Sequence, residues 1–481
     1  MSLDLRPVLP ALIVAVTGLA VLLAQAFTPK GRNTPAAALS LAGLSAALVS
    51  ILLMARGTRF GLGSATGGTL IADSFALYLQ GLLVVIGALA VLLSPPYLRA
   101  NGLVRGEYYS LMLFALVGMM GLVSATELIS LFVALEIMSV ALYALVAMRR
   151  DQIESQEAGI KYFVTGAFSS AFFLYGIALL YGTSGSTSLG RVASAAASPG
   201  REPLAILGAG LLLVGLGFKV ASVPFHMWAP DVYEGAPTTV TAFMSAGVKA
   251  AAFGAFVRIF GVALPALAGV WQPAVAALAV VSMVFGNLGA LAQSNVKRML
   301  AWSSIAHAGY LLTAVVAAPQ VAAEAVLFYL VGYAAVNLGG FGALAALAKD
   351  GREPLSLQDV AGLAQRRPAV SGALTVFLVS LTGVPISAGF VGKFYLFGAA
   401  VGAGYVTLAV VGVLMSVVSA FYYLRVVVYM YMREPVGEDA WAPVGMGAAA
   451  ALVVSTAIVL GLGVYPAPLL ALARAAARAI Y

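Results

Sequence analysis

Apolar segments of about twenty residues recur along almost the whole chain, from residue 8 to residue 464. A helix of that length crosses the hydrocarbon core of a bilayer, which is ~30 Å thick. Of the 481 residues, 62% are apolar and only 9% are charged, whereas a soluble domain is about 25% charged. The pattern excludes a soluble enzyme, and its repetition excludes a protein with a single membrane anchor. We therefore expect an all-α polytopic membrane protein.

Fourteen segments are long enough to span the membrane, and they form a single transmembrane domain over residues 1–481. They lie at residues 8–27, 35–54, 73–94, 108–124, 127–147, 158–182, 204–223, 237–261, 273–292, 299–318, 322–347, 370–393, 402–431 and 441–464. The first ends in Ala-Gln-Ala, which resembles a signal-peptidase site. Because its apolar run is longer than a signal core of ~7–15 residues, we expect an uncleaved span.

The segments between and after the spans predict the orientation. Residues 466–481 carry Arg474 and Arg478 four positions apart, which predicts a short interfacial helix. Loops after odd-numbered spans hold fourteen Lys and Arg residues, among them Arg149 and Lys297, and the other side holds eight, with Arg258 counted there although it lies near the end of its span. Basic loops stay in the cytoplasm, so both termini are expected to be periplasmic. The composition, rich in Ala, Gly and Arg, favours a bacterial plasma (inner) membrane.

Four lysines and one glutamate fall inside apolar spans. A lysine at mid-membrane costs ~2.5–3.5 kcal/mol on insertion scales, so each needs a reason. A structural role is one possible reason: a charged residue in a span can form an ion pair, or a lysine can extend its side chain to the lipid headgroups. That alternative is strongest for the lysine near the start of its span, Lys161. The five residues are Glu136, Lys161, Lys219, Lys249 and Lys393.

Hydroxyl side chains accompany these charges. Thr241 and Ser245 precede Lys249 at intervals of four residues, so they share one helix face. Ser303 and Ser304 stand four and three residues before His307. A similar stripe follows the lysine of the sixth span. Small hydroxyl residues also help membrane helices to pack, but three stripes that each include an ionisable group favour a hydrated path.

Two of the lysine-bearing spans contain a proline that should break the helix. Pro224 follows Lys219, and Pro385 precedes Lys393. A proline removes a backbone donor and frees carbonyl groups. Broken helices at corresponding places in two halves are typical of inverted-repeat transporters. We therefore predict two inverted five-helix repeats, at residues 107–261 and 273–432, with the seventh and twelfth spans broken; prolines that merely kink helices are the alternative.

Proton transfer is the chemistry that these residues can perform. A lysine shielded from water holds its proton less readily, and a nearby carboxylate reverses this effect. Movement of Glu136 relative to Lys219 would therefore switch the charge of Lys219. Lys249 would receive the proton, with His307 or ordered water between, and Lys393 would release it.

The same sequence offers little else for chemistry. It has no cysteine, which excludes disulfides, thiolate zinc sites and iron–sulfur ligation by this chain. Two histidines are too few for a histidine-rich metal site. The net charge of +8 comes from loops, with no basic run of the kind that binds nucleic acid. We expect no cofactor, no metal and no nucleic-acid partner.

Several stretches closely resemble subunit N of proton-translocating NADH:quinone oxidoreductase, respiratory complex I, in the antiporter-like membrane subunit family. The similarity runs from about residue 70 to residue 430 and is weak at both ends. The stretches are FVALEIMSVALYALVA, EAGIKYFVTGAFSSAFFLYG, GFKVASVPFHMWAPDVYEGAPTTVTAFMSAGVKAAAF, KRMLAWSSIAHAGYLL and LTGVPISAGFVGKFYLF. Of these, HMWAPDVYEGAP followed by the lysine of the eighth span is the most specific.

The resemblance implies fourteen helices in two inverted repeats, and roles for particular residues. Glu136 matches the family's helix-five glutamate, Lys219 the helix-seven lysine and Lys249 the central helix-eight lysine. Lys393 matches the helix-twelve lysine near the exit, where a sister subunit has glutamate; a longer sister needs a lateral helix for which 481 residues leave no room. Lys161 and His307 match further family positions. Flavin, iron–sulfur clusters and the main quinone site are then expected in partner subunits.

Two other classes of function remain open. One is the membrane subunit of a multi-subunit cation/proton antiporter, which clustered acidic residues for Na⁺ would favour. The other is a passive membrane scaffold. The spans hold mostly lysines and one deep glutamate, which favours protons over Na⁺ and speaks against a scaffold.

Overall fold

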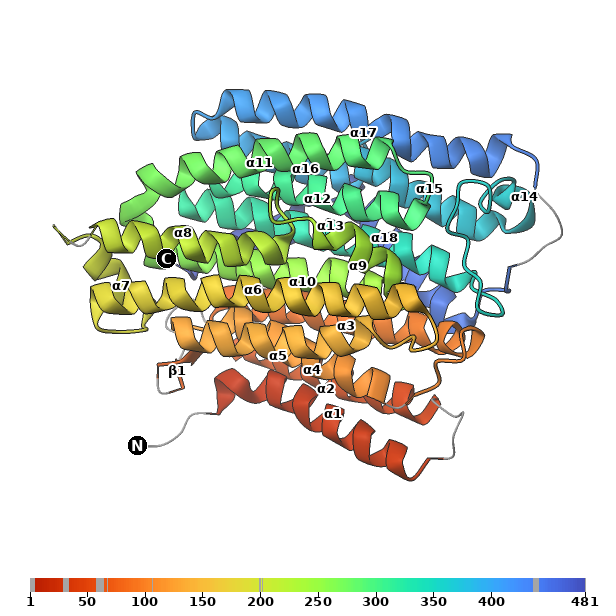
Figure 1. The fold of residues 1–481 in the computed structure, drawn as a ribbon, viewed down its shortest axis with the longest axis horizontal. Coiled ribbons are helices and arrows are strands. Elements are labelled where there is room, and N and C mark those ends of the chain that lie inside the picture. Colours follow the sequence, from red (N-terminus) through yellow and green to blue (C-terminus); the bar gives the residue numbers. More distant parts are fainter. Residues whose placement is uncertain are drawn as a thin grey trace.

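The computed structural model describes residues 5–28, 34–57, 65–66, 68–105, 107–198, 200, 202–435 and 441–480. Within these ranges the chain is a bundle of helices that lie side by side, with α1 at one edge and α17 at the other (Figure 1). The long helices are α1 Leu9–Ala26, α2 Thr34–Gly57, α3 Ser74–Ala100, α4 Glu107–Ser124, α5 Leu128–Val146, α6 Ile153–Ser184, α8 Glu202–Val220, α10 Thr238–Arg258, α11 Ala268–Leu291, α12 Val296–Val315, α13 Pro319–Ala346, α15 Pro368–Thr382, α16 Ala388–Gly402, α17 Val406–Met432 and α18 Met446–Val464.

Short elements connect and close the bundle. The only strands in the described ranges form one antiparallel pair, β1 Ala65–Thr66 and β2 Leu70–Ile71. The short helices are η1 Arg6–Val8, α7 Leu189–Ala196, α9 Trp228–Gly235, the π-helical η2 Ile259–Ala263, η3 Pro265–Leu267, α14 Leu363–Arg366 and α19 Ala467–Arg478. The predicted tail helix is therefore present as α19, and Tyr481 lies outside the described residues.

The prediction of an all-α polytopic membrane fold is confirmed. In the described part of the chain, 12 helices are long and apolar enough to cross a membrane. They coincide with twelve of the fourteen predicted spans. The other two spans are α12 and the pair α15–α16. Helices suit this solvent because they satisfy their backbone hydrogen bonds internally. Figure 1 places the start of α1 and the end of the described chain at the same end of the bundle.

Both predicted helix breaks are present, and the second differs in extent from the prediction. The first follows α8, where Ala221 adopts a φ of 58°. The second separates α15 from α16, with φ values of 90° at Gly383 and 72° at Ile386. The left-handed region is unfavourable for a β-branched residue. The predicted twelfth span, 370–393, is thus two half-helices that continue to Gly402, because the chain resumes a full helix after the break.

At the second break, Gly389 allows the start of α16 to approach the end of α15 closely. A Cβ atom on Gly389 would lie 1.8 Å from the carbonyl oxygen of Ser380. The Gly389 backbone N–H also donates to Ser380 Oγ at 3.1 Å. The start of α16 therefore packs directly against the last turn of α15, which positions Lys393 one turn further along α16.

Helix α10 lies at the centre of the bundle. All its residues from Thr238 to Arg258 are buried. Lys249 is near the middle of this helix and is itself 1% exposed. Arg258, which was counted among the basic residues of one side although the predicted span 237–261 contains it, is the buried last residue of α10.

Candidate functional site

Lys219, near the end of α8, lies in an aromatic cage. Its Nζ atom is 5.7, 5.6 and 5.5 Å from the ring centroids of Tyr143, Tyr162 and Phe218. It donates a hydrogen bond of 2.8 Å to Ser139 Oγ. The lysine itself is 2% exposed. Ring faces stabilise a cation, and the hydroxyl replaces part of its hydration.

Glu136 and Lys219 are neighbours without a direct bond. Glu136 is half-buried on α5, and its Oε1 atom accepts a hydrogen bond of 2.5 Å from Ser170 on α6. Within the described residues it forms no salt bridge with Lys219, whose partner is Ser139, three positions later on α5. The expected pair is therefore connected through one face of α5, and Ser139 and Ser170 were not among the predicted residues.

Lys249 contacts α12 and α13. Its Nζ atom donates to the carbonyl oxygen of Ser304 and lies 5.4 Å from the ring centroid of Tyr333. The Tyr333 hydroxyl is in turn 2.9 Å from Ser304 Oγ. The lysine is 1% exposed, so these groups are its immediate polar environment.

His307 lies at the junction of a buried hydroxyl network. Its Nδ1 atom hydrogen-bonds to the Tyr329 hydroxyl, and its Nε2 atom is 3.2 Å from the Tyr423 hydroxyl. Tyr423 also bonds to Ser303 Oγ. Ser303 and His307 are thus in one network, and Ser304 bonds to Tyr333, whose ring centroid is 5.6 Å from that of His307. The tyrosines come from α13 and α17 and were not among the predicted residues.

Lys393 occupies the second helix break. Its Nζ atom donates to the carbonyl oxygens of Leu381 at 2.9 Å and Thr382 at 3.0 Å. These are carbonyls at the end of α15 that a continuous helix would have used. The same Nζ atom lies 4.7 Å from the ring centroid of Tyr310, and the Tyr310 ring is 5.2 Å from that of His307. Tyr310 therefore lies between the lysine and the histidine.

Lys161 is apart from the other lysines. Helix α6 begins at Ile153, five residues before the predicted span, so Lys161 is further from its end than expected. The side chain is 35% exposed and forms a salt bridge with Asp231 and a second, of 3.6 Å, with Glu157. Asp231 also pairs with Arg298 at 2.8 Å. The structure thus places Lys161 in a surface ion-pair network that ties α6 to α9 and α12.

A buried cluster around Glu353 was not predicted. Glu353 lies between α13 and α14, and its side chain is 2% exposed. It accepts hydrogen bonds from Tyr97, at 2.6 Å, and from Thr238, and it pairs with Arg149 at 3.0 Å. Lys297 lies nearby, 1% exposed. Arg149 and Lys297 were read as loop charges, because nothing in a single sequence reveals that a long connection folds back over the bundle.

Electrostatics in this cluster favour the ionised carboxylate. Burial by itself raises the pKa of Glu353. The charges of Lys297 and Arg149 and the hydrogen bonds from Thr238 and Tyr97 outweigh that effect and hold the pKa below its ordinary value of 4.5. Since Thr238 is the first residue of α10, this cluster anchors one end of the helix that carries Lys249.

A buried ion pair anchors the other end of α10. Arg258 donates from both terminal nitrogens to Asp73, at 3.0 and 3.1 Å. The side chains are 5% and 6% exposed. Asp73 also caps α3 by accepting from the Ala76 backbone N–H at 2.7 Å. Helix α10 is therefore held by charged groups at both ends.

Comparison with known proteins identifies the family. A family model described as NADH:quinone oxidoreductase/Mrp antiporter, TM, matches residues 125–419. NADH-quinone oxidoreductase subunit N of Trichlorobacter lovleyi is 43% identical over 481 residues, which cover 100% of this chain and 98% of the relative. The chain belongs to the subunit N family of NADH-quinone oxidoreductases. The predicted resemblance is thereby confirmed.

Solved structures agree with this assignment. A chain of respiratory complex I from Thermus thermophilus with bound aureothin superposes on the present chain with a TM-score of 0.82. The two are 38% identical, and the match covers 96% of this chain and 98% of that one. A chain of the Mrp complex from a Dietzia species has a TM-score of 0.86 over 98% and 97% of the two chains. Its identity of 22% shows a common fold only.

Within the described residues, no three His, Asp or Glu side chains are grouped as a metal site. The titratable groups of the central bundle are instead dispersed along α8, α10, α12 and α16, with hydroxyl groups between several of them. Such an arrangement can store and pass protons, because hydroxyl and imidazole groups both donate and accept.

Proposed function

We propose that this chain moves protons across the membrane as the N-type subunit of an NADH-quinone oxidoreductase, while partner subunits carry flavin, iron–sulfur clusters and the main quinone site. The identity of 43% to a full-length subunit N supports this assignment. The observation that carries it is the burial of Lys219, Lys249 and Lys393, at 2%, 1% and 5% exposure. Intramembrane charges are costly and are kept for function.

The proposed path begins at Glu136 and Lys219. A change in the position of Glu136 on α5 alters the distance of its carboxylate from Lys219, and with it the stability of the Lys219 ammonium. Ser139 accepts a hydrogen bond from the ammonium. From Lys219 the proton passes to Lys249 through ordered water, because no side chain bridges the two among the described residues. Ordered waters transmit such contacts with little loss of energy.

The second half of the path follows α12. Lys249 donates a hydrogen bond to the carbonyl oxygen of Ser304. The hydroxyl groups of Tyr333, Tyr423 and Tyr329 bond to Ser304 or His307 of α12. From the histidine the proton passes beside Tyr310 to Lys393, which releases it. His307 therefore acts between Lys249 and Lys393 in this proposal. We assign Lys161 a supporting role, because its salt bridge to Asp231 holds α6 against α9.

The two halves of the path correspond to the repeats 107–261 and 273–432. Each repeat has one helix break and one lysine beside it, with Ala221 and Ile386 in the left-handed region at the two breaks. Strained backbone of this kind persists where the surroundings enforce it, and it concentrates at functional sites. The loops after odd-numbered spans would face the cytoplasm, and both termini would face the periplasm of a bacterial inner membrane, because the former loops hold more Lys and Arg residues.

The membrane subunit of a cation/proton antiporter is the alternative function. The Mrp chain shares the fold at 22% identity, whereas the chain of complex I is 38% identical. The buried charges in the central bundle are mostly lysines, which repel Na⁺. Uptake of radioactive Na⁺ that depends on this chain alone would favour the antiporter.

The test is a mutant cycle in the assembled oxidoreductase. Glu136→Ala and Lys219→Ala are each expected to lower proton pumping strongly and equally, and the double variant should be no worse than either, since both changes disable one switch. Glu136→Asp should retain part of the activity. Lys349→Ala, on an exposed lysine of the loop after α13, is the matched control. Pumping and quinone reduction are measured separately in membrane vesicles. Strictly additive losses, or a fully active Glu136→Ala complex, would refute the switch.

A further inference from the structure

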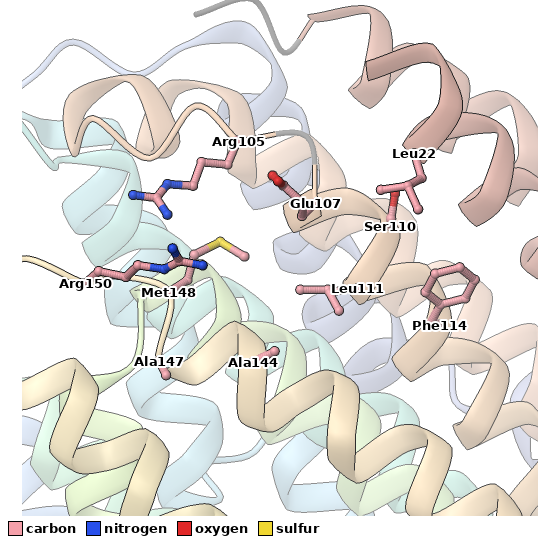
Figure 2. A pocket seen from close by; sticks show the side chains of 10 residues that line it. All are labelled: Leu22, Arg105, Glu107, Ser110, Leu111, Phe114, Ala144, Ala147, Met148 and Arg150. Carbon is pink, nitrogen blue, oxygen red and sulfur yellow. The ribbon is translucent and has the colours of Figure 1, made fainter. Parts of the chain in front are cut away.

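A pocket of about 440 Å³ lies between α1, α4 and the end of α5, away from the buried lysines. Figure 2 shows two arginines, Arg105 and Arg150, at its mouth, with Glu107 beside them. Leu22 and Phe114 belong to its apolar wall. Arg105 lies in the loop after α3 and Arg150 in the loop after α5, so both are on the side with the larger number of basic residues.

The polar groups of this pocket are not satisfied by the protein. Within the described residues, neither Arg105 nor Arg150 has a carboxylate within the 4.0 Å of a salt bridge. Ser110, on the pocket wall, is 2% exposed, and its Oγ atom has no hydrogen-bond partner. A buried hydroxyl without a partner is uncommon in native proteins. Three groups that prefer an anion or an acceptor therefore line one cavity.

The lining has the chemistry of a lipid site. Guanidinium groups bind the oxygens of a phosphate through paired hydrogen bonds. Two arginines and one glutamate leave a charge of +1 at the mouth, which one phosphodiester neutralises. The walls below are aliphatic and aromatic and open toward α1, whose Leu22 is 42% exposed. An acyl chain would cover these walls, which include Leu111 and Phe114 of α4.

We propose that this pocket binds one anionic glycerophospholipid of the cytoplasmic leaflet, such as phosphatidylglycerol. The phosphodiester lies between Arg105 and Arg150, and the headgroup hydroxyls donate to Glu107. An acyl chain runs down the apolar wall beside Phe114. Basic pockets between membrane helices bind anionic headgroups in this manner. The lipid joins α1 to the α4–α5 pair, and α5 carries Glu136.

The test is native mass spectrometry of the full chain, titrated with phosphatidylglycerol in detergent. Arg105→Gln combined with Arg150→Gln should weaken binding about tenfold or more, because two charge-assisted contacts are lost. Glu107→Gln should not weaken it, because the amide oxygen still accepts from the headgroup hydroxyls and a negative charge near the phosphodiester is removed. The matched control removes two exposed arginines of the same side, Arg352→Gln with Arg433→Gln, and should change the affinity less than about twofold, as expected for exposed charges.

Three results would overturn the proposal. Equal weakening in the control pair would mean that general surface charge attracts the lipid. Equal binding of phosphatidylcholine would remove the requirement for an anionic headgroup, and displacement of the lipid by millimolar inorganic phosphate would indicate a free-anion site. In the assembled complex, a photoreactive phosphatidylglycerol should label peptides of α4 and α5. No labelling there would mean that a partner subunit covers the pocket, which also refutes it.

Discussion

The ion pair between Asp73 and Arg258 offers a direct test of how α10 is fixed. Both charges are almost completely shielded from water, at 6% and 5% exposure, and the geometry is bidentate. Arg258 also lies over the Phe75 ring, 5.1 Å from its centroid. Removal of one partner leaves the other as an uncompensated buried charge, which typically costs ~3–5 kcal/mol.

Asp73→Asn isolates the charge from the helix cap. The asparagine oxygen can still accept from the Ala76 backbone N–H, so the cap of α3 is kept. We expect Asp73→Asn to lower the free energy of unfolding by ~3–5 kcal/mol. Asp73→Ala loses the cap as well, which adds ~0.5–2 kcal/mol. The difference between the two variants therefore measures the cap.

The double variant Asp73→Asn with Arg258→Met removes both charges and keeps the volume of the arginine stem. Uncharged replacements of a buried pair are often neutral or stabilising, so this variant should be more stable than Asp73→Asn alone. The assay is unfolding of the full chain in mixed micelles by SDS titration, followed by tryptophan fluorescence. Trp271 packs 5.2 Å from Phe260, just beyond α10, and reports on this region. If the double variant is less stable than Asp73→Asn, the ion pair does not account for the loss.

Three further predictions concern the second helix break and the Glu353 cluster. Lys393→Ala should abolish proton pumping while the complex still assembles, since the change relieves a buried charge; native gels and vesicle pumping assays check both, and loss of assembly would make Lys393 structural. Gly389→Ala places a Cβ atom 1.8 Å from a carbonyl oxygen and should destabilise the chain by ~1–3 kcal/mol or more, whereas Gly398→Ala, with nothing within 4 Å of its Cβ, should not; equal melting temperatures would contradict this. Because the pKa of Glu353 is lower in the folded protein than its ordinary 4.5, the ionised carboxylate contributes stability above pH 4.5 that is lost as the pH falls through the folded-state value. Glu353→Gln should therefore be less stable at pH 7 and less sensitive to acid, and parallel melting curves from pH 7 to pH 3 would refute this.

Much of the membrane architecture could be predicted from the sequence. Spans are visible because the bilayer demands about twenty apolar residues, and charges within them stand out against that background. For the same reason Lys219, Lys249 and Lys393 were recognised as buried, and Pro224 and Pro385 marked the two helix breaks. Period alone placed Ser303, Ser304 and His307 on one face of α12, where the structure has them.

Other features of the site depend on which helices are neighbours. Tyr329, Tyr333 and Tyr423 look like ordinary core residues in their own spans, and only the packing of α13 and α17 on α12 brings their hydroxyls to His307 and Ser304. The sequence predicted Glu136 and Lys219 as a pair, and among the described residues no salt bridge joins them. The sequence did not indicate that Ser139 and Ser170 bind the two charges in place of a salt bridge.

The sequence by itself determined what must lie in the membrane, because transfer from water to hydrocarbon is a local property of each segment. The tertiary structure decided which charges meet. Arg258 and Arg149 were counted with the loops, yet one pairs with Asp73, 185 positions away, and the other with Glu353. Lys161 was grouped with the lysines inside spans, with an ion pair as the alternative, and its contact with Asp231 in a surface network is such an ion pair. Which distant residues form ion pairs depends on how the helices pack in three dimensions. The hydropathy of each segment does not indicate which helices are neighbours.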